Sequence, residues 1–157
     1  RRQRQMCIRD RRSIMSKYEK LKLENQLCFS LYAASREVIK VYKPLLDKYG
    51  LTYTQYIVML VVWEHEKITV KEMGQKLHLD SGTLTPVLKK LFSMELINKY
   101  RDVNDDRVVI VEVTQKGKEL KDEILEVPEQ MYCKFDGNVE EAIELKKMLD
   151  KLLLRFK

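Results

Sequence analysis

Apolar residues recur at alternating steps of four and three between residues 22 and 49, which predicts a long helix that buries one narrow stripe. A stripe this narrow suits the packing of one helix against others. Gly50 is expected to end this helix, and residues 54–66, apolar on nearly all sides, predict a central buried helix. The stripe consists of Leu27, Leu31, Ala34, Val38, Val41 and Leu45.

Two short helices are predicted next. Thr69 and Glu72 have the spacing of a capping box, and the first helix is expected to run to about Leu77. Asp80 or Ser81 then caps the second helix. Two short helices joined by a tight turn are typical of a helix-turn-helix. The inward face of the second helix is formed by Leu84, Leu88 and Leu91.

A β-rich segment, residues 97–114, follows at once. Its two runs flank the turn formers Asn104, Asp105 and Asp106, and so predict a two-stranded hairpin. A helix-turn-helix followed directly by a charged hairpin has the element order of a winged helix. The predicted fold is therefore mostly α with a small β-hairpin, in the α+β class.

Two further helices are predicted after the hairpin. Thr114 is expected to cap a helix that runs through Pro128, with a kink at that proline. A last amphipathic helix is expected from Val139 onward.

The net charge is unevenly distributed. The chain has 157 residues, 45% hydrophobic and 34% charged, which suits one globular domain. Of its formal charge of +6, residues 1–13 supply six arginines and one aspartate, 6 − 1 = +5, so the remainder carries 6 − 5 = +1. This segment could be a basic arm that binds phosphates. The alternative is that it is non-native, because it has no periodicity and Met15 would be a natural start. We expect residues 1–14 to be a non-native or disordered basic tail and residues 15–157 to form a single domain.

No stretch approaches the roughly 18 apolar residues of a membrane-spanning helix, so we expect a cytoplasmic protein without a membrane partner. Cysteines in that compartment stay reduced unless they have redox or metal work. Neither a metal site nor a cofactor is predicted. His65 and His78 are isolated, and the two cysteines outside the tail, Cys28 and Cys133, are too few for a structural zinc site in one chain.

The second short helix is the candidate for DNA recognition. If it enters a major groove, the outward residues of its N-terminal end meet bases and phosphates. Their hydroxyls can bond phosphates or base edges, threonine methyls can touch thymine methyls, and lysines can neutralise phosphates. The alternative is an ordinary solvated face. Pro86 lies deep for a first turn, so an irregular or tight turn is expected there. The candidates are Ser81, Thr83, Thr85, Pro86, Lys89 and Lys90.

Arg107 is the candidate contact of the hairpin tip, where an arginine can enter the adjacent minor groove. The alternative is a local ion pair with Asp105 or Asp106, and both can hold, because a carboxylate can orient a guanidinium. With a net charge of only +1 outside the tail, affinity must come from local patches on two copies. This favours a homodimer on double-stranded DNA with two half-sites.

Cys28 shares one helical row with Tyr32 and Tyr42. Tyr32 can lie over Cys28, whereas Tyr42, fourteen residues on, is roughly 21 Å away along the helix and can reach a cysteine only of a second, antiparallel chain. Tyr53 can join it. A phenol that donates to sulfur favours the thiolate, the form that attacks peroxide, and a helix N-terminus acts in the same direction. The alternatives are a buried filler cysteine and ordinary core tyrosines.

Cys133, on the helix after the hairpin, offers a second thiol. Such a thiol can trap a sulfenic acid as a disulfide and so prevent irreversible oxidation. The alternative is again a small buried residue.

Five segments resemble motifs of the MarR family, specifically its organic hydroperoxide resistance regulators. They are "KLENQLCFSLYAASRE", "YKPLLDKYGLTYTQY", "ITVKEMGQKL", "LDSGTLTPVLKKL" and "DVNDDRVVIVEVTQKG", within about residues 22–128. The resemblance implies that Cys28 is the peroxidatic cysteine and that Tyr42 and Tyr53 match tyrosines that hydrogen-bond its sulfur from the partner subunit.

The resemblance also implies that residues 79–91 hold the recognition helix and that Arg107 is the wing arginine. The family pattern before this arginine is Asp-Glu, where this chain has Asp105 and Asp106. Cys133 falls where two-cysteine members carry their resolving cysteine. Residues 52–114 are then expected to form the DNA-binding lobe, and residues 20–50 and 115–157 the dimerisation helices.

These expectations combine into a homodimeric winged-helix repressor, not an enzyme, that binds palindromic promoter DNA when Cys28 is reduced. Organic hydroperoxides would be its oxidant. Two alternatives remain open at this point: a thiol peroxidase that turns over at Cys28, and a MarR-type regulator gated by a phenolic ligand.

Overall fold

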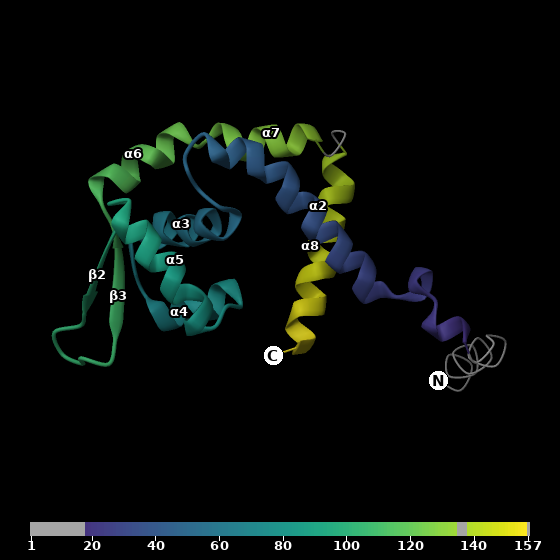
Figure 1. Ribbon diagram of the computed structural model, residues 1–157, viewed down its shortest axis with the longest axis horizontal. Coiled ribbons are helices and arrows are strands. Elements are labelled where there is room, and N and C mark those ends of the chain that lie inside the picture. The colour runs from purple at the N-terminus through teal and green to yellow at the C-terminus, as the bar shows by residue number, and fades with distance from the viewer. Residues whose placement is uncertain (1–17, 135–137, 157) are drawn as a thin grey trace. The chain divides into compact units, whose positions relative to one another are not determined.

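The computed structural model describes residues 18–134 and 138–156 (Figure 1). The expected basic tail, residues 1–14, lies outside them. The described chain divides into two compact units between Lys40 and Val41, a boundary that falls inside helix α2 (Leu27–Asp47). The sequence-based division into a DNA-binding lobe and dimerisation helices stays a prediction.

Helix α2 begins at Leu27, the first residue of the apolar stripe, rather than at residue 22, where the predicted segment began. Two short 3-10 turns, η1 (Glu19–Leu21) and η2 (Leu23–Asn25), precede it. The Asn25 side chain donates to the Glu19 carbonyl at 2.8 Å, and that of Gln26 donates to the Lys20 carbonyl at 2.6 Å. Side-chain amides that bond nearby carbonyls compete with helical hydrogen bonds, which accounts for the start at Leu27 rather than residue 22.

Helix α3 (Tyr53–His65) forms the centre of the core, as predicted. Thr52 caps it through a reciprocal capping box with Gln55. At its far end the indole of Trp63 donates to the Gly117 carbonyl at 2.7 Å, which ties α3 to the segment after the sheet. Its fully buried side chains are Val58, Met59 and Val62.

The two short helices are α4 (Val70–Leu77) and α5 (Ser81–Ser93). The predicted Thr69–Glu72 capping box is confirmed, and Asp80 is the residue that caps α5. His78 ends α4 in the left-handed conformation, with φ 53°. The predicted inward face of α5 is buried: Leu84, Leu88 and Leu91.

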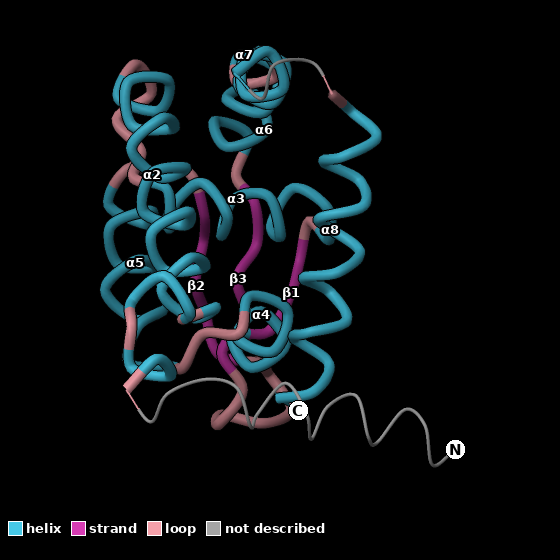
Figure 2. The backbone as a smooth tube through the Cα atoms, turned by 90° about the vertical axis from the view of Figure 1, so that its right-hand side faces the viewer, coloured by secondary structure: helices cyan, strands magenta, loops and turns pink. Residues whose placement is uncertain are grey.

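The sheet has three antiparallel strands rather than the predicted two (Figure 2). The predicted hairpin is confirmed as β2 (Ile97–Arg101) and β3 (Val109–Val113). Strand β1 (Lys67–Thr69) pairs with the other edge of β3. Three residues between two helices are too short to reveal a period of two, so the sequence did not indicate β1.

After the sheet come α6 (Gln115–Glu123), α7 (Glu126–Lys134), α8 (Val139–Leu153) and the 3-10 turn η3 (Leu154–Phe156). Thr114 caps α6 as predicted, but the expected kink at Pro128 is wrong. The helix breaks before Glu126, and Pro128 lies in the first turn of α7, where no intrahelical N–H donor is needed.

Helix α8 has no buried residue, although it is amphipathic as predicted. Among its exposed apolar side chains are Val139, Ile143, Leu145, Met148 and Leu153. Within the part of the chain that the structure describes, no helix combines the length and apolarity needed to cross a bilayer. The winged-helix order of α4, α5, β2 and β3 is confirmed.

Candidate nucleic-acid interface and redox site

The head of α5 and the loop between β2 and β3 line one groove of about 580 Å³, together with α4. The groove brings together Ser81 and Arg107, which were predicted as DNA contacts from two separate elements. It also includes Lys71 and Gln75 of α4, which the sequence analysis missed. Their signal was available, because both lie within two turns of the capped start of α4. The lining thus combines two cations, Lys71 and Arg107, with the hydroxyls of Thr69 and Ser81, on the winged-helix elements labelled in Figure 1.

Asp80 organises the first turn of α5. Its Oδ1 accepts from the Thr83 backbone N–H at 2.8 Å, and its Oδ2 accepts from the Thr83 hydroxyl at 3.0 Å. Both hydrogen bonds lower the pKa of the Asp80 carboxyl, and the one from the Thr83 backbone has the larger effect. The Thr85 hydroxyl donates to the Ser81 carbonyl at 2.7 Å. All six candidate residues of α5 are exposed: Ser81, Thr83, Thr85, Pro86, Lys89 and Lys90.

The irregular turn expected at Pro86 is wrong, because α5 is α-helical throughout. Proline lacks the N–H that would bond the carbonyl of Gly82, four residues earlier. Gly82 and Pro86 are both exposed, so water can hydrate that carbonyl and the helix continues.

The wing, residues 102–108, is shaped by its own side chains. The Asp105 carboxylate accepts from the Arg107 backbone N–H at 3.0 Å. The Arg101 guanidinium donates to the Asp106 carbonyl. Asp105 thus supports the turn with its carboxylate, and Asp106 with its main chain. This contact of Arg101 was not predicted from the sequence.

Arg107 itself is exposed, and its guanidinium has no hydrogen-bond or ion-pair partner among residues 18–134 and 138–156. The alternative of an ion pair with Asp105 or Asp106 is therefore not seen in the described chain. The charge remains available for a ligand in the groove.

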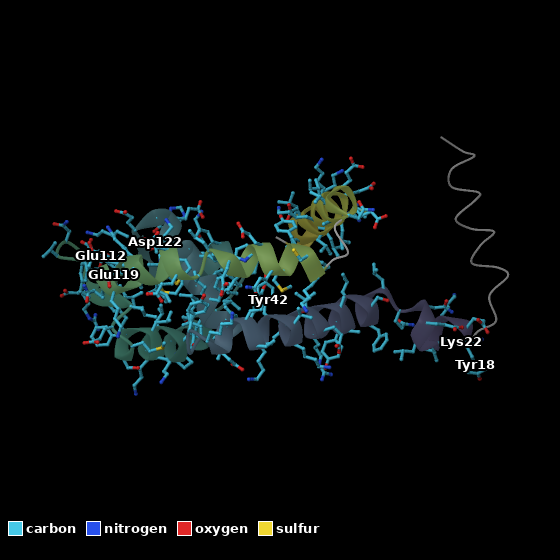
Figure 3. The ribbon with its side chains drawn as sticks, turned by 90° about the horizontal axis from the view of Figure 1, so that it is seen from above. Tyr18, Lys22, Tyr42, Glu112, Glu119 and Asp122 are labelled. Carbon is cyan, nitrogen blue, oxygen red and sulfur yellow. The ribbon has the colours of Figure 1, made fainter. Side chains whose placement is uncertain are left out.

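Three phenols cluster where α2 meets α3. The Tyr42 ring centroid lies 4.8 Å from that of Tyr53 and 5.8 Å from that of Tyr56. Tyr42 belongs to α2 (Figure 3), and Tyr53 and Tyr56 belong to α3. Tyr56 was not predicted as a site residue, because it lies in a run that is apolar on nearly all sides; its spacing of three from Tyr53 was the available signal.

Burial raises the pKa of all three phenols, and that of Tyr42 rises to about 12, with Tyr53 as the second cause. Their hydroxyls therefore stay protonated at neutral pH and can donate. None has a hydrogen-bond partner within the described residues. The cluster thus holds donors that have no acceptor among the described residues.

Cys28 and Cys133 are both free and exposed, so neither fills the core of this chain. Cys28 is the second residue of α2, and Cys133 lies one residue before the end of α7. The Tyr32 hydroxyl accepts from Arg36 at 3.3 Å, and that guanidinium lies 5.4 Å from the Tyr32 ring centroid, while the contact of Tyr32 with Cys28 stays a prediction. Arg36 is a further residue that the sequence analysis missed.

Comparison with known proteins gives the following relatives. The family model "Transcriptional regulator SarA/Rot" matches residues 40–124, more than half of the chain. The organic hydroperoxide resistance transcriptional regulator of Bacillus subtilis is 47% identical over 138 residues, which cover 88% of this chain and 94% of that protein.

Solved structures agree. AbfR of Staphylococcus epidermidis, overoxidized and bound to DNA, superposes with a TM-score of 0.74 at 32% identity, over 90% of this chain and 100% of that one. Reduced AbfR bound to DNA and disulfide-formed AbfR also match, with TM-scores of 0.72 and 0.62. A mutant MarR of Escherichia coli complexed with operator DNA, 19% identical, has a TM-score of 0.72 over 88% of this chain and 99% of that one, and supports the fold.

Proposed function

Because the chain belongs to the MarR/SarA family of transcriptional regulators, we propose that it is a redox-sensing repressor. It binds palindromic promoter DNA as a homodimer while Cys28 is reduced, and releases the DNA when an organic hydroperoxide oxidises Cys28. The family consists of transcriptional regulators, not enzymes, which argues against the thiol peroxidase alternative.

The groove shared by α4, α5 and the wing supports the DNA-binding step. The exposed head of α5 would enter the major groove, and Arg107 would reach the adjacent minor groove. Lys89 and Lys90 follow on the exposed side of α5 and would meet phosphates. Relatives crystallised on DNA support this use of the fold.

The observation that carries the sensing step is the phenol cluster. Tyr42 and Tyr53 hold protonated hydroxyls without a partner in the described chain. They would donate to the Cys28 sulfur of a second subunit, whose exposed position leaves it open to such contacts. The exposed apolar side chains of α8 support a second copy, because apolar patches of this kind mark interfaces.

The chemistry at Cys28 balances with the hydroperoxide as the oxidant. The thiolate sulfur attacks the terminal peroxide oxygen, the O–O bond breaks, and the alkoxide takes up a proton and leaves as an alcohol. Sulfur is oxidised by two electrons to sulfenic acid, and the peroxide is reduced by two. A Cys133 thiol of the partner subunit then attacks this sulfur, water leaves, and a disulfide forms.

Disulfide formation is the step that we assign to release. The overoxidized relative AbfR was crystallised on DNA, and the same protein was also crystallised in a disulfide form. A covalent link would shift the two subunits, and a modest rotation suffices because both half-sites must be bound together.

A gel shift on the protein's own promoter, with and without cumene hydroperoxide, tests the sensing step. The wild type is expected to release DNA on oxidation, and Cys28→Ser to stay bound. Release that persists unchanged in Cys28→Ser would sink the proposal.

Non-reducing electrophoresis tests the second cysteine. After peroxide the wild type should give a dimer-sized band that is absent in Cys133→Ser and returns to monomer on reduction. If the band forms equally in Cys133→Ser, or not at all in the wild type, Cys133 is not the resolving residue.

A further inference from the structure

The first turn of α5 contains two threonine hydroxyls whose protons are already used. Thr83 donates its hydroxyl proton to Asp80 Oδ2 at 3.0 Å, and Thr85 donates its own to the Ser81 carbonyl at 2.7 Å. A hydroxyl has one proton and two lone pairs. Both side chains therefore face solvent as acceptors with a methyl group, although hydroxyls in general can also donate.

The Thr83 contact is the more restrictive of the two. An ionised carboxylate is an acceptor only, so the shared proton must come from the threonine. The lowered pKa of Asp80 keeps the carboxyl ionised at neutral pH. A hydrogen bond to a charged acceptor is roughly twice as strong as a neutral one, so Thr83 gives up its proton less readily than Thr85.

In B-DNA the partners of an acceptor and of a donor differ. Adenine N6 and cytosine N4 present amino protons in the major groove, whereas guanine presents two acceptors, N7 and O6, and thymine presents O4 beside its methyl group. A side chain that can only accept is matched by an amino group, and its methyl by a thymine methyl. Guanine opposite such a side chain would face it with like-polarity atoms.

We propose that Thr83 and Thr85 act as acceptor-and-methyl readers of the major groove, so that the operator places adenine or cytosine amino groups, or thymine methyls, opposite them and excludes guanine. The proposal rests on the proposed DNA binding and specifies its sequence preference. Ser81, the other hydroxyl of this turn, has no side-chain hydrogen bond within the described residues and keeps its proton free.

Asp80→Asn tests the polarity directly. Asparagine is an equally good N-cap, so its oxygen should keep the Thr83 backbone bond. Its amide would then stand where Oδ2 stood and donate to the Thr83 hydroxyl, which must accept and turn its own proton toward the groove. The variant thus changes the hydroxyl from acceptor to donor without removing an atom of Thr83.

The measurement is selection of binding sites from random DNA with the reduced full-length protein. The position that Thr83 contacts is the one whose preference is lost in Thr83→Ala. At that position the wild type should disfavour guanine by about tenfold or more, and Asp80→Asn should reduce or reverse this discrimination. Glu72→Gln, the same carboxylate-to-amide change in the cap of α4, is the matched control and should leave the preference unchanged.

Guanine selected opposite Thr83 by the wild type would overturn the inference, as would an identical preference in a folded Asp80→Asn. Either result would leave DNA binding intact. If the wild type selects no sequence at all, the proposed function fails instead. Thr83→Val, which keeps a methyl but has no oxygen, should retain a preference for thymine and lose that for an amino group.

Discussion

The Tyr42 ring lies 4.8 Å from the Tyr53 ring between centroids, at an interplanar angle of 49°, although the two side chains come from different helices. Gly50, with φ +66°, lies in the turn that follows α2 and precedes α3. Their contact is set within one chain, whereas the hydroxyls have no partner in its described part. The contact between the two rings is therefore made without a second subunit.

Tyr42→Phe should slow the oxidation of Cys28 without changing DNA binding by the reduced protein. The ring packing against Tyr53 remains, but one donor to the sulfur is lost; a hydrogen bond to a charged group is worth about 1.5 kcal/mol or more, or about tenfold in rate. Stopped-flow oxidation by cumene hydroperoxide measures this. The control is Tyr100→Phe, which removes a phenol of β2 that donates to Glu112. In this variant Cys28 should be oxidised at the wild-type rate.

Alkaline unfolding should report the buried Tyr42 phenol. Its pKa is raised from 10 to about 12 in the folded chain, so the folded state holds this proton more tightly than the unfolded state. The contribution to stability is fully present below pH 10 and is lost as the pH rises through 12. Urea midpoints measured across this range should fall less steeply for Tyr42→Phe than for the wild type. The urea midpoints of Tyr32→Phe, which changes an exposed phenol, should fall as steeply with pH as those of the wild type. The same slope in the wild type, Tyr42→Phe and Tyr32→Phe would contradict a stabilising role of the buried Tyr42 phenol.

Gly117→Ala should destabilise the fold strongly. A Cβ at this position would lie 2.3 Å from the Leu96 carbonyl oxygen, which is backbone and cannot rotate away. We expect a loss of about 3 kcal/mol in the free energy of unfolding. Gly82→Ala is the contrast: its Cβ would meet only the end of the Asp80 side chain, at 3.0 Å, and stability should stay within about 1 kcal/mol. Equal losses in denaturant unfolding would refute the argument.

Local signals in the sequence located most of the DNA-binding elements. Capping patterns fixed the starts of α4 and α6, and Asp80 was one of two candidates for α5. Two predictions failed where the surroundings of a proline override a local rule. Pro86 lies on an exposed turn where water can reach the carbonyl of Gly82, and Pro128 follows a helix break just before α7 that apolar periodicity does not reveal.

The candidate site was predicted less completely than the fold. Ser81 and Arg107 were predicted separately, and nothing in the sequence indicated that they share a groove, because this depends on how the loop 102–108 folds over α4. Tyr56 was hidden because a phenol in an apolar run has the pattern of core. Side-chain pairing across elements is a tertiary property, so a single sequence leaves it open.

His78→Gly should stabilise the protein. His78 holds φ 53° and ψ 38° at the end of α4, a conformation that costs a residue with a Cβ about 1 kcal/mol and costs glycine little. Part of the gain is lost to the greater freedom of glycine in the unfolded chain, so the expected net is about 0.5 kcal/mol. Thermal unfolding measures it. Lys76→Gly, within the last turn of the same helix, should instead destabilise by about 1 kcal/mol; the same sign for both would contradict the left-handed cap.

Arg107→Ala should weaken DNA binding and lower its salt dependence while leaving thermal stability unchanged. The guanidinium has no partner in the described chain, so its removal breaks no internal contact, but it would take away one phosphate-neutralising charge per subunit. The slope of log affinity against log salt should fall by about one per subunit.

Arg101→Ala should also weaken binding, but through the wing: it removes the bond to the Asp106 carbonyl and should increase amide exchange in residues 102–108. Lys118→Ala removes a charge from α6, which does not line the groove, and should alter the slope least of the three. A slope that falls equally for Lys118→Ala would mean that Arg107 acts only through net charge, and not by contact with the DNA.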